Sequence, residues 1–372
     1  MSTDIQRWIA EGAQRKASDF LWVGGKAPQL KIDGRFFPIG AYTLSPEEEQ
    51  RRIEGIVAEL LSLTLSKLSL EQFLKQVHEN GYGEIVWSQG ELRLRTSVYL
   101  EKGRLAISIR LLPQRILTFE EIFAERQFID PVKALLSRQN GLILITGPTG
   151  TGKTTTLATF IDYILRTREV HIITLEDPIE YLFPNNRSGY IGTISQREFG
   201  PGRDFPKFDE AIVAGMRQAP NVFMVGEIRD LPTAYAALQA AETGHLVLAT
   251  LHTRNAPETV SRYVDMFSEE IRSMIRLQFA ISTLGIICQR LVARADGKGR
   301  IAAFEMLSMT PACAHVIRDN KLQQMGNYMR GEGSIMFDAY LAELVKRRLV
   351  TEDVGLLCAN DPQELKQCLV PK

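Results

Sequence analysis

One stretch of the chain combines glycines, a lysine and hydroxyl side chains in a spacing that binds phosphate. Glycines let successive backbone N–H groups turn toward an anion, and a helix that begins at the loop adds its positive end. Lys153 would reach the β- and γ-phosphates, and the Thr154 hydroxyl would bind Mg²⁺. The pattern G-x-x-x-x-G-K-[ST] therefore predicts a site for ATP. The stretch consists of Gly147, Pro148, Thr149, Gly150, Thr151, Gly152, Lys153, Thr154 and Thr155.

The residues on either side decide between this prediction and an ordinary glycine-rich turn. Apolar residues 141–146 predict a buried strand before the loop, and residues 154–165 predict a helix after it. A strand, a glycine-rich loop and a helix in this order form the setting that a phosphate loop needs. We therefore favour nucleotide binding over a simple turn.

Carboxylates follow two further apolar runs. Glu227 ends the run of residues 221–226, and ligands of parallel α/β sheets bind where strands end. Glu227 is predicted to orient Mg²⁺ through water. The alternative is that Glu227 is an ordinary glutamate at the end of a strand, with no role in binding. Glu176, Asp177 and Glu180 follow the run of residues 170–175. One of them would polarise the attacking water. The residue pattern alone does not choose between Glu176 and Glu180 for this role. Glu176 is also a candidate metal ligand.

Two of the five histidines, His245 and His252, flank the apolar run of residues 246–250. A lone histidine is often a structural hydrogen-bonding residue, and the sequence alone does not separate that role from contact with phosphate. No third His or Cys lies at a ligand spacing, so a zinc-type site is not expected.

Composition narrows the class of protein. The 372 residues suit two domains, and 45% hydrophobic with 24% charged residues is typical of a soluble globular chain. Lys plus Arg equal Asp plus Glu at 44 each, so the net charge is zero. The chain therefore lacks the surplus of positive charge that is typical of nucleic-acid-binding proteins. No signal peptide and no run of about 20 apolar residues is found, so any membrane role is expected to be peripheral. Reduced thiols are expected from the unpaired spacing of Cys288, Cys313, Cys358 and Cys368.

Residues 1–112 predict a small α+β domain. Asp33-Gly34 indicates a hairpin turn, while Ser45 and Ser69 each begin a helix with a capping signature, the second of which ends at Gly81 or Gly83. Alternating residues predict three strands, at 84–87, 91–99 and 104–111. Residues 113–118, which include Pro113, are expected to form a linker.

From residue 119 onward, apolar strands alternate with helices, which is typical of a parallel α/β sheet. The predicted strands are residues 141–146, 170–175, 222–225 and 246–250. Beyond about residue 268 we expect mostly helix.

In their order along the chain, these motifs resemble those of the type IV pilus retraction (twitching-motility) ATPases, the PilT and PilU group of secretion-superfamily motors. The resemblance covers nearly the whole chain. Besides the phosphate loop, it rests on residues 175–181, 196–198, 224–230, 241–246 and 249–253.

The resemblance implies a hexameric ring of subunits. Each subunit would pair a PAS-like N-terminal domain, residues 1–112, with a RecA-like ATPase domain and helical C-terminal part, residues 119–372. It implies Glu180 as the catalytic glutamate, Glu227 as the Walker-B glutamate, and His245 and His252 as sensors of the γ-phosphate. Arginines of the N-terminal sheet contact nucleotide in the family, and the matching strands here carry Arg93, Arg95, Arg104 and Arg110.

The implied function is ATP hydrolysis that drives retraction or disassembly of a type IV pilus. The implied partners are further copies of the chain and an inner-membrane pilus platform protein, with a related pilus ATPase as an optional one. The implied location is the cytoplasm, at the inner face of the cytoplasmic membrane.

Three other functions compete with this interpretation. A conjugation or type IVB secretion ATPase of the same superfamily would share the motifs, whereas the complete motif set argues against a weakly active accessory subunit. A nucleic-acid-binding RecA-like protein is disfavoured by the zero net charge and by the lack of interleaved aromatic and basic residues.

Overall fold

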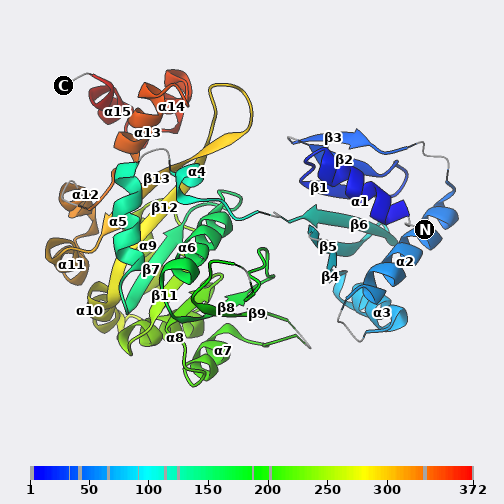
Figure 1. Ribbon diagram of the computed structural model, residues 1–372, viewed down its shortest axis with the longest axis horizontal. Helices are drawn as coiled ribbons and strands as arrows, with labels where there is room; N and C mark the ends of the chain where they lie inside the picture. Colours follow the sequence, from blue (N-terminus) through cyan, green and yellow to red (C-terminus); the bar gives the residue numbers. More distant parts are fainter. Residues whose placement is uncertain are drawn as a thin grey trace. The chain divides into compact units, whose positions relative to one another are not determined.

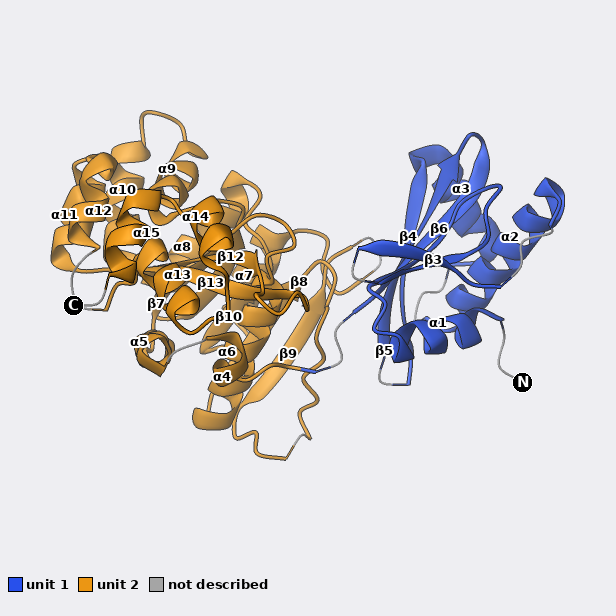
Figure 2. Ribbon diagram, turned by 90° about the horizontal axis from the view of Figure 1, so that it is seen from above, with its two compact units in different colours: residues 1–115 blue, residues 116–372 orange. Residues whose placement is uncertain are grey.

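The computed structural model of the chain describes residues 4–32, 34–40, 44–64, 68–90, 92–112, 115–123, 126–186, 188–200, 203–329 and 333–370. The chain divides into two compact units, residues 1–115 and 116–372, which Figure 2 shows in different colours. The division falls at the predicted linker, of which residues 113–114 lie outside the described part. Each unit has its own sheet and core.

The first unit is a six-stranded antiparallel sheet with order β3-β2-β1-β6-β5-β4. Apolar side chains from its helices and from one face of the sheet form one core, which includes Val57, Phe73 and Leu94. The predicted α+β class is confirmed. Its elements are α1 (Asp4–Gln14), β1 (Asp19–Trp22), β2 (Gln29–Ile32), β3 (Arg35–Pro38), α2 (Pro46–Ser62), α3 (Leu70–Asn80), β4 (Tyr82–Gln89), β5 (Leu92–Glu101) and β6 (Arg104–Leu111).

Both predicted helix starts in this unit are confirmed. The Ser45 hydroxyl accepts from the Glu48 backbone N–H at 3.3 Å, and the Glu48 carboxylate accepts from the Ser45 N–H at 2.8 Å. Ser69 and Gln72 form the same reciprocal pair before α3. That helix ends at Gly81, whose φ of +82° favours glycine.

The predicted hairpin is also present. Strands β2 and β3 pair in antiparallel register, with Ile32 opposite Arg35. Gly34 has a φ of +81°, the conformation that a tight hairpin turn requires. Asp33, the other predicted turn residue, lies outside the described residues.

The second unit is a seven-stranded sheet with helices on both faces (Figure 1). Its first half contains α4 (Phe119–Ile122), α5 (Arg126–Leu136), β7 (Gly141–Thr146), α6 (Lys153–Thr167), β8 (His171–Glu176), β9 (Thr193–Glu198), α7 (Phe208–Gly215), β10 (Val222–Val225), α8 (Leu231–Glu242) and β11 (Leu246–Leu251). Its second half contains α9 (Ala256–Asp265), α10 (Arg272–Ser282), β12 (Thr283–Ala293), β13 (Arg300–Ser308), α11 (Pro311–Arg318), a 3₁₀ turn (Leu322–Gln324), α12 (Met325–Tyr328), α13 (Phe337–Lys346), α14 (Glu352–Cys358) and α15 (Pro362–Leu369).

The strand order in this sheet is β13-β12-β7-β11-β10-β8-β9. All neighbouring pairs are parallel except β12 with β13. The predicted strands correspond to β7, β8, β10 and β11, so the predicted parallel α/β sheet is confirmed. The C-terminal ends of these strands share one edge, and the phosphate loop, both candidate acids and His252 follow strands there.

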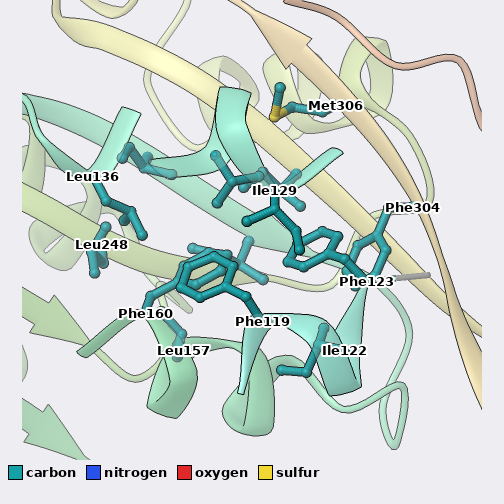
Figure 3. Close-up of a cluster of buried hydrophobic side chains, with 14 of the residues drawn as sticks. Phe119, Ile122, Phe123, Ile129, Leu136, Leu157, Phe160, Leu248, Phe304 and Met306 are labelled. Atoms are coloured by element: carbon teal, nitrogen blue, oxygen red, sulfur yellow. The ribbon is translucent and has the colours of Figure 1, made fainter. Parts of the chain in front are cut away.

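Side chains of β7 alternate between two cores, one on each face of the sheet. Ile143 belongs to a cluster that also contains residues of α4, α5, α6 and α13. In this cluster Phe119 stacks on Phe160 with 5.6 Å between ring centroids (Figure 3). Leu142 belongs to the cluster formed with α7, α8, α9, α10 and α11. Packing on both faces explains why β7 is apolar throughout.

The expectation of mostly helix after about residue 268 holds for most elements of this part but misses two strands. Thr283–Ala293 and Arg300–Ser308 form the antiparallel strands β12 and β13, and β12 pairs with β7. Residues 301–307 include Ala, Glu, Met and Leu, which favour helix in isolation, so pairing within the sheet overrides local propensity. Across the described residues, no helix has the length and apolar content needed to cross a bilayer.

Candidate active site

The phosphate loop joins β7 to α6 in a backbone conformation that depends on its glycines. Gly147, Gly150 and Gly152 have φ angles of +148°, +77° and +87°. A Cβ on Gly147 would lie 2.3 Å from the backbone oxygen of Gln289 on β12, so no larger residue fits there without backbone movement. The sequence pattern thus reflects both conformation and close packing.

The lysine of the loop is buried and already bound to it. Lys153 is 9% exposed, and its Nζ donates to the carbonyls of Gly147 at 2.7 Å and Pro148 at 3.1 Å. Burial lowers the pKa of Lys153, and the carboxylate of Glu227 opposes this shift. The ammonium group is therefore held at the loop with little water around it, where its attraction for an anion is strong.

Four charged or polar groups continue from Lys153 across the edge of the sheet. His252 Nδ1 lies 3.3 Å from Lys153 Nζ, and its Nε2 lies 2.8 Å from Glu227 Oε1. Arg229 donates to Glu227 Oε2 at 2.7 Å and to Asp177 Oδ2 at 3.2 Å. This chain of contacts, called here the site relay, connects the loop after β7 with the ends of β11, β10 and β8.

The two nitrogens of His252 face groups of opposite charge. Nε2 lies beside the Glu227 carboxylate and Nδ1 beside the Lys153 ammonium, and the tautomer with its proton on Nε2 can satisfy both contacts. Burial alone would lower the pKa of Arg229, and the carboxylates of Glu227 and Asp177 outweigh it and raise that pKa. Apart from His252, the relay thus alternates positive and negative groups beside the phosphate loop.

The two candidate acids after β8 differ in their surroundings. Glu176 is 4% exposed, and its Oε1 accepts from the Thr174 hydroxyl at 2.7 Å and the Gln196 amide at 3.2 Å. Glu180 is half-buried and lies in the loop that follows β8. Its neighbour Tyr181 lies 2.9 Å from Thr155 Oγ1 in the phosphate loop. Glu180 therefore lies in a loop that contacts the phosphate loop through Tyr181, whereas the Glu176 carboxylate is engaged by side chains of β8 and β9.

The loop that carries Glu180 is held by the edge strand β9. The Gln196 amide donates to the Tyr181 carbonyl at 2.8 Å. The Glu198 carboxylate accepts from the Ile179 N–H at 3.0 Å. These contacts fix the backbone on both sides of Glu180.

The structure separates the two histidines. His245 precedes β11, whereas His252 follows it, so the two lie at opposite edges of the sheet, roughly 20 Å apart along the strand. His245 Nδ1 lies 3.1 Å from the Ala240 carbonyl at the end of α8, and its ring packs edge-on against Phe223. Of the two, His252 is the one that lies beside the phosphate loop of its own chain.

Replacing the two histidines separates these roles. His252→Ala is expected to lower kcat about tenfold or more, because it removes contacts to Glu227 and Lys153. His245→Ala is expected to leave kcat unchanged and to lower the free energy of unfolding by about 1 kcal/mol, through loss of one hydrogen bond. Phosphate-release assays and thermal unfolding measure both effects. Loss of turnover in a fully folded His245→Ala protein would instead place His245 at the nucleotide of a neighbouring subunit.

The four predicted arginines share one face of the first unit's sheet. Along β5 and β6, Leu94, Val98 and Ile107 point into the core, so the alternate positions lie on the opposite face. Arg95 pairs with Glu84 at 2.8 Å, and Arg110 pairs with Asp19 at 3.0 Å. The four residues are Arg93, Arg95, Arg104 and Arg110.

The oxygen donors at the loop suit Mg²⁺. The Thr154 hydroxyl lies at the start of α6, and the Glu227 carboxylate follows β10. Hydroxyl and carboxylate oxygens are the ligands that this ion prefers. Both Glu227 oxygens are engaged by His252 and Arg229, which fits contact through water. No cluster of three or more His, Cys, Asp or Glu suited to another metal occurs in the part of the chain that the structure describes.

From the sequence, Asp177 is predicted only as one of the candidate acids, and no role is predicted for Arg229 or Gln289. Asp177 and Arg229 stand inside the matched motifs, each one or two residues after a candidate acid. Gln289 is a polar residue within an apolar stretch that forms β12.

Comparison with known proteins shows the family of the chain. The sequence model of the "Type II/IV secretion system protein" family matches residues 75–356. The type IV pilus retraction ATPase PilT of Pseudomonas aeruginosa is 34% identical over 97% of this chain and 99% of its own length. The type IV pilus ATPase PilU of the same organism is 31% identical over 98% of this chain and 90% of its own length.

A solved structure agrees with these sequence relatives. The crystal structure of the pilus retraction motor PilT with bound ADP has a TM-score of 0.83 and 36% identity, over 98% of this chain and 100% of that one. The match extends over both units and includes the phosphate loop. The chain therefore belongs to the type II/IV secretion system protein family, as a homologue of the ATPases that retract type IV pili.

Proposed function

We propose that this chain is the subunit of a ring-shaped motor that hydrolyses ATP to retract or disassemble a type IV pilus. The site relay is the observation that carries the proposal, because it joins the lysine of the phosphate loop to Glu227 and His252 within one chain. Phosphoryl transfer needs positioned charges more than covalent chemistry, and the relay supplies them.

In this proposal the backbone N–H groups of the loop and Lys153 bind the phosphates of ATP. Thr154, and Glu227 through water, hold Mg²⁺, which when bound neutralises charge on the phosphates. Glu180 orients the attacking water in line with the γ-phosphate. His252, which lies between Glu227 and Lys153, is placed to report whether the γ-phosphate is present.

The proposed assembly is a homo-hexamer that docks on an inner-membrane pilus platform protein from the cytoplasmic side, beside a related pilus ATPase in cells that have one. We propose that residues 1–112 act as a PAS-like domain. Its arginine face, Arg93, Arg95, Arg104 and Arg110, would approach nucleotide in the same or a neighbouring subunit. Four arginines on one sheet face are the support for this role.

Two measurements on the purified chain and its host test the proposal. Analytical ultracentrifugation should show hexamers with Mg-ATP, with turnover that rises as subunits assemble. Deletion of the gene should leave cells with extended pili that do not retract, and the wild-type gene should restore retraction. If the deletion strain retracts pili normally but no longer exports a secretion substrate, the function of the chain is protein export and not pilus retraction.

A further inference from the structure

Gln289 on β12 is a buried polar residue for which the site relay and the phosphate loop sequence provide no role. Its side chain is 3% exposed, so its amide must find partners inside the protein. The amide oxygen accepts from the Thr156 hydroxyl on α6 at 2.7 Å. The amide nitrogen donates to the Thr151 carbonyl in the phosphate loop at 2.7 Å. One side chain thus joins β12, α6 and the loop.

The partners determine the orientation of the amide. A carbonyl such as that of Thr151 can only accept, so it requires the nitrogen of Gln289. The Thr156 hydroxyl then donates to the oxygen. A flipped amide would place two oxygens against each other, so only one orientation satisfies both contacts.

This orientation has a consequence for the neighbouring peptide unit. In a trans peptide the carbonyl oxygen and the following N–H point in opposite directions. The Thr151 carbonyl points to Gln289, so the Gly152 N–H is directed away from β12. The Gly152 N–H is one of the donors that a phosphate loop offers to its anion.

The loop also packs directly on Gln289 at both of its ends. A Cβ on Gly147 would lie 2.3 Å from the Gln289 backbone oxygen, and one on Gly152 would lie 3.1 Å from its side-chain nitrogen. Contact with the Gln289 backbone therefore requires glycine at position 147, whereas a side chain at position 152 would displace the Gln289 amide slightly. The φ angles of both residues also favour glycine.

We infer that Gln289 is a positioning residue for nucleotide binding, which holds the phosphate loop in its anion-binding conformation before nucleotide arrives. It acts through Thr151 and Gly152 and does not itself contact phosphate. Preorganised donors bind an anion without first paying the entropy of ordering the loop. The inference rests on the proposed nucleotide site.

The first test compares two variants of the same strand in the full-length protein. Gln289→Met keeps the length of the side chain but removes both hydrogen bonds, so the Kd for Mg-ADP should rise roughly tenfold in isothermal titration calorimetry. Thr283→Val is the control, because Thr283 is 2% exposed and its hydroxyl has no hydrogen-bond partner among the residues that the structure describes. Its Kd should equal that of the wild type.

A second variant tests the donor role by chemistry instead of by size. In Gln289→Glu, an ionised carboxylate would face the Thr151 carbonyl and repel it, whereas the protonated acid can donate to it as the amide does. The ratio of variant to wild-type Kd should therefore fall toward one as the pH is lowered from about 8.5 to about 6. Taking the ratio at each pH removes the pH effects that the variant and the wild type share.

The outcomes separate this inference from the proposed function. If the wild-type protein does not bind Mg-ADP, the proposed function itself is wrong. Wild-type binding together with an unchanged Kd in Gln289→Met overturns only the role of Gln289. Equal losses in Gln289→Met and Thr283→Val, or a Gln289→Glu ratio that does not change with pH, also overturn it, because they show general destabilisation of β12. The Gln289→Glu profile decides the question if the methionine variant does not fold.

Discussion

Replacing Lys153 by alanine is expected to lower kcat/KM for ATP roughly 10²- to 10³-fold while the protein stays folded. The ammonium group lies at the loop carbonyls of Gly147 and Pro148, and it is buried before any nucleotide binds. A buried charge acts on phosphate through a low effective dielectric, so its loss affects binding and the transition state alike. Phosphate-release kinetics and ADP calorimetry measure the two effects.

Stability should change little, and this distinguishes the prediction from simple unfolding. Burial lowers the pKa of Lys153, which means that the fold bears a cost for holding the charge. Alanine removes that cost together with the hydrogen bonds. Lys207→Ala, at an exposed lysine that pairs with Glu210, is the matched control and should keep full activity. Wild-type turnover by Lys153→Ala would refute the site.

The second large effect is expected from Glu180→Gln, which should bind ATP with near wild-type affinity and hydrolyse it roughly 10²- to 10⁴-fold more slowly. The amide keeps the size of the side chain but cannot accept a proton from water. Glu180 lies beside Tyr181, which contacts Thr155 of the phosphate loop, so the loop after β8 is held at the nucleotide site. Single-turnover hydrolysis with separate binding measurements shows whether only chemistry is lost.

Glu176→Gln resolves the choice that the sequence left open. Its carboxylate is bound by the Thr174 hydroxyl and the Gln196 amide, so a glutamine there should lower thermal stability and leave kcat within a few-fold of the wild type. If Glu176→Gln stops hydrolysis and Glu180→Gln does not, the two assignments must be exchanged.

Much of the fold could be predicted from the sequence because local signals and the final structure agree. Capping residues at Ser45 and Ser69 marked helix starts, and apolar runs such as residues 141–146 marked strands buried on both faces. The hairpin of β12 and β13 could not be predicted in this way. Its residues have mixed propensity, and their extended conformation comes from pairing with β7, which lies about 140 residues earlier in the chain.

The site was predictable to the extent that its chemistry lies in contiguous motifs. Lys153 stands in a segment whose spacing alone suggests phosphate chemistry, and Glu227 follows a buried strand, whereas Glu180 was preferred to Glu176 only through the family resemblance. The sequence alone did not separate His245 from His252, because it does not show which end of a strand faces the ligand until the direction of the strand is known. Gln289 was missed because its partners, Thr151 and Thr156, are far from it in the sequence and adjacent only after folding.

The two halves of the site differ in how easily they can come apart. The phosphate loop follows β7, which has two strands on one side and four on the other, whereas the loop with Glu180 is held by Gln196 and Glu198 of β9, the last strand of the sheet. Local unfolding begins at edges and costs less there than in the interior. Fraying of β9 would release Glu180 while the phosphate loop remained intact. If Glu180 orients the attacking water as proposed, loosening of β9 would slow hydrolysis and leave the groups that bind the phosphates in place.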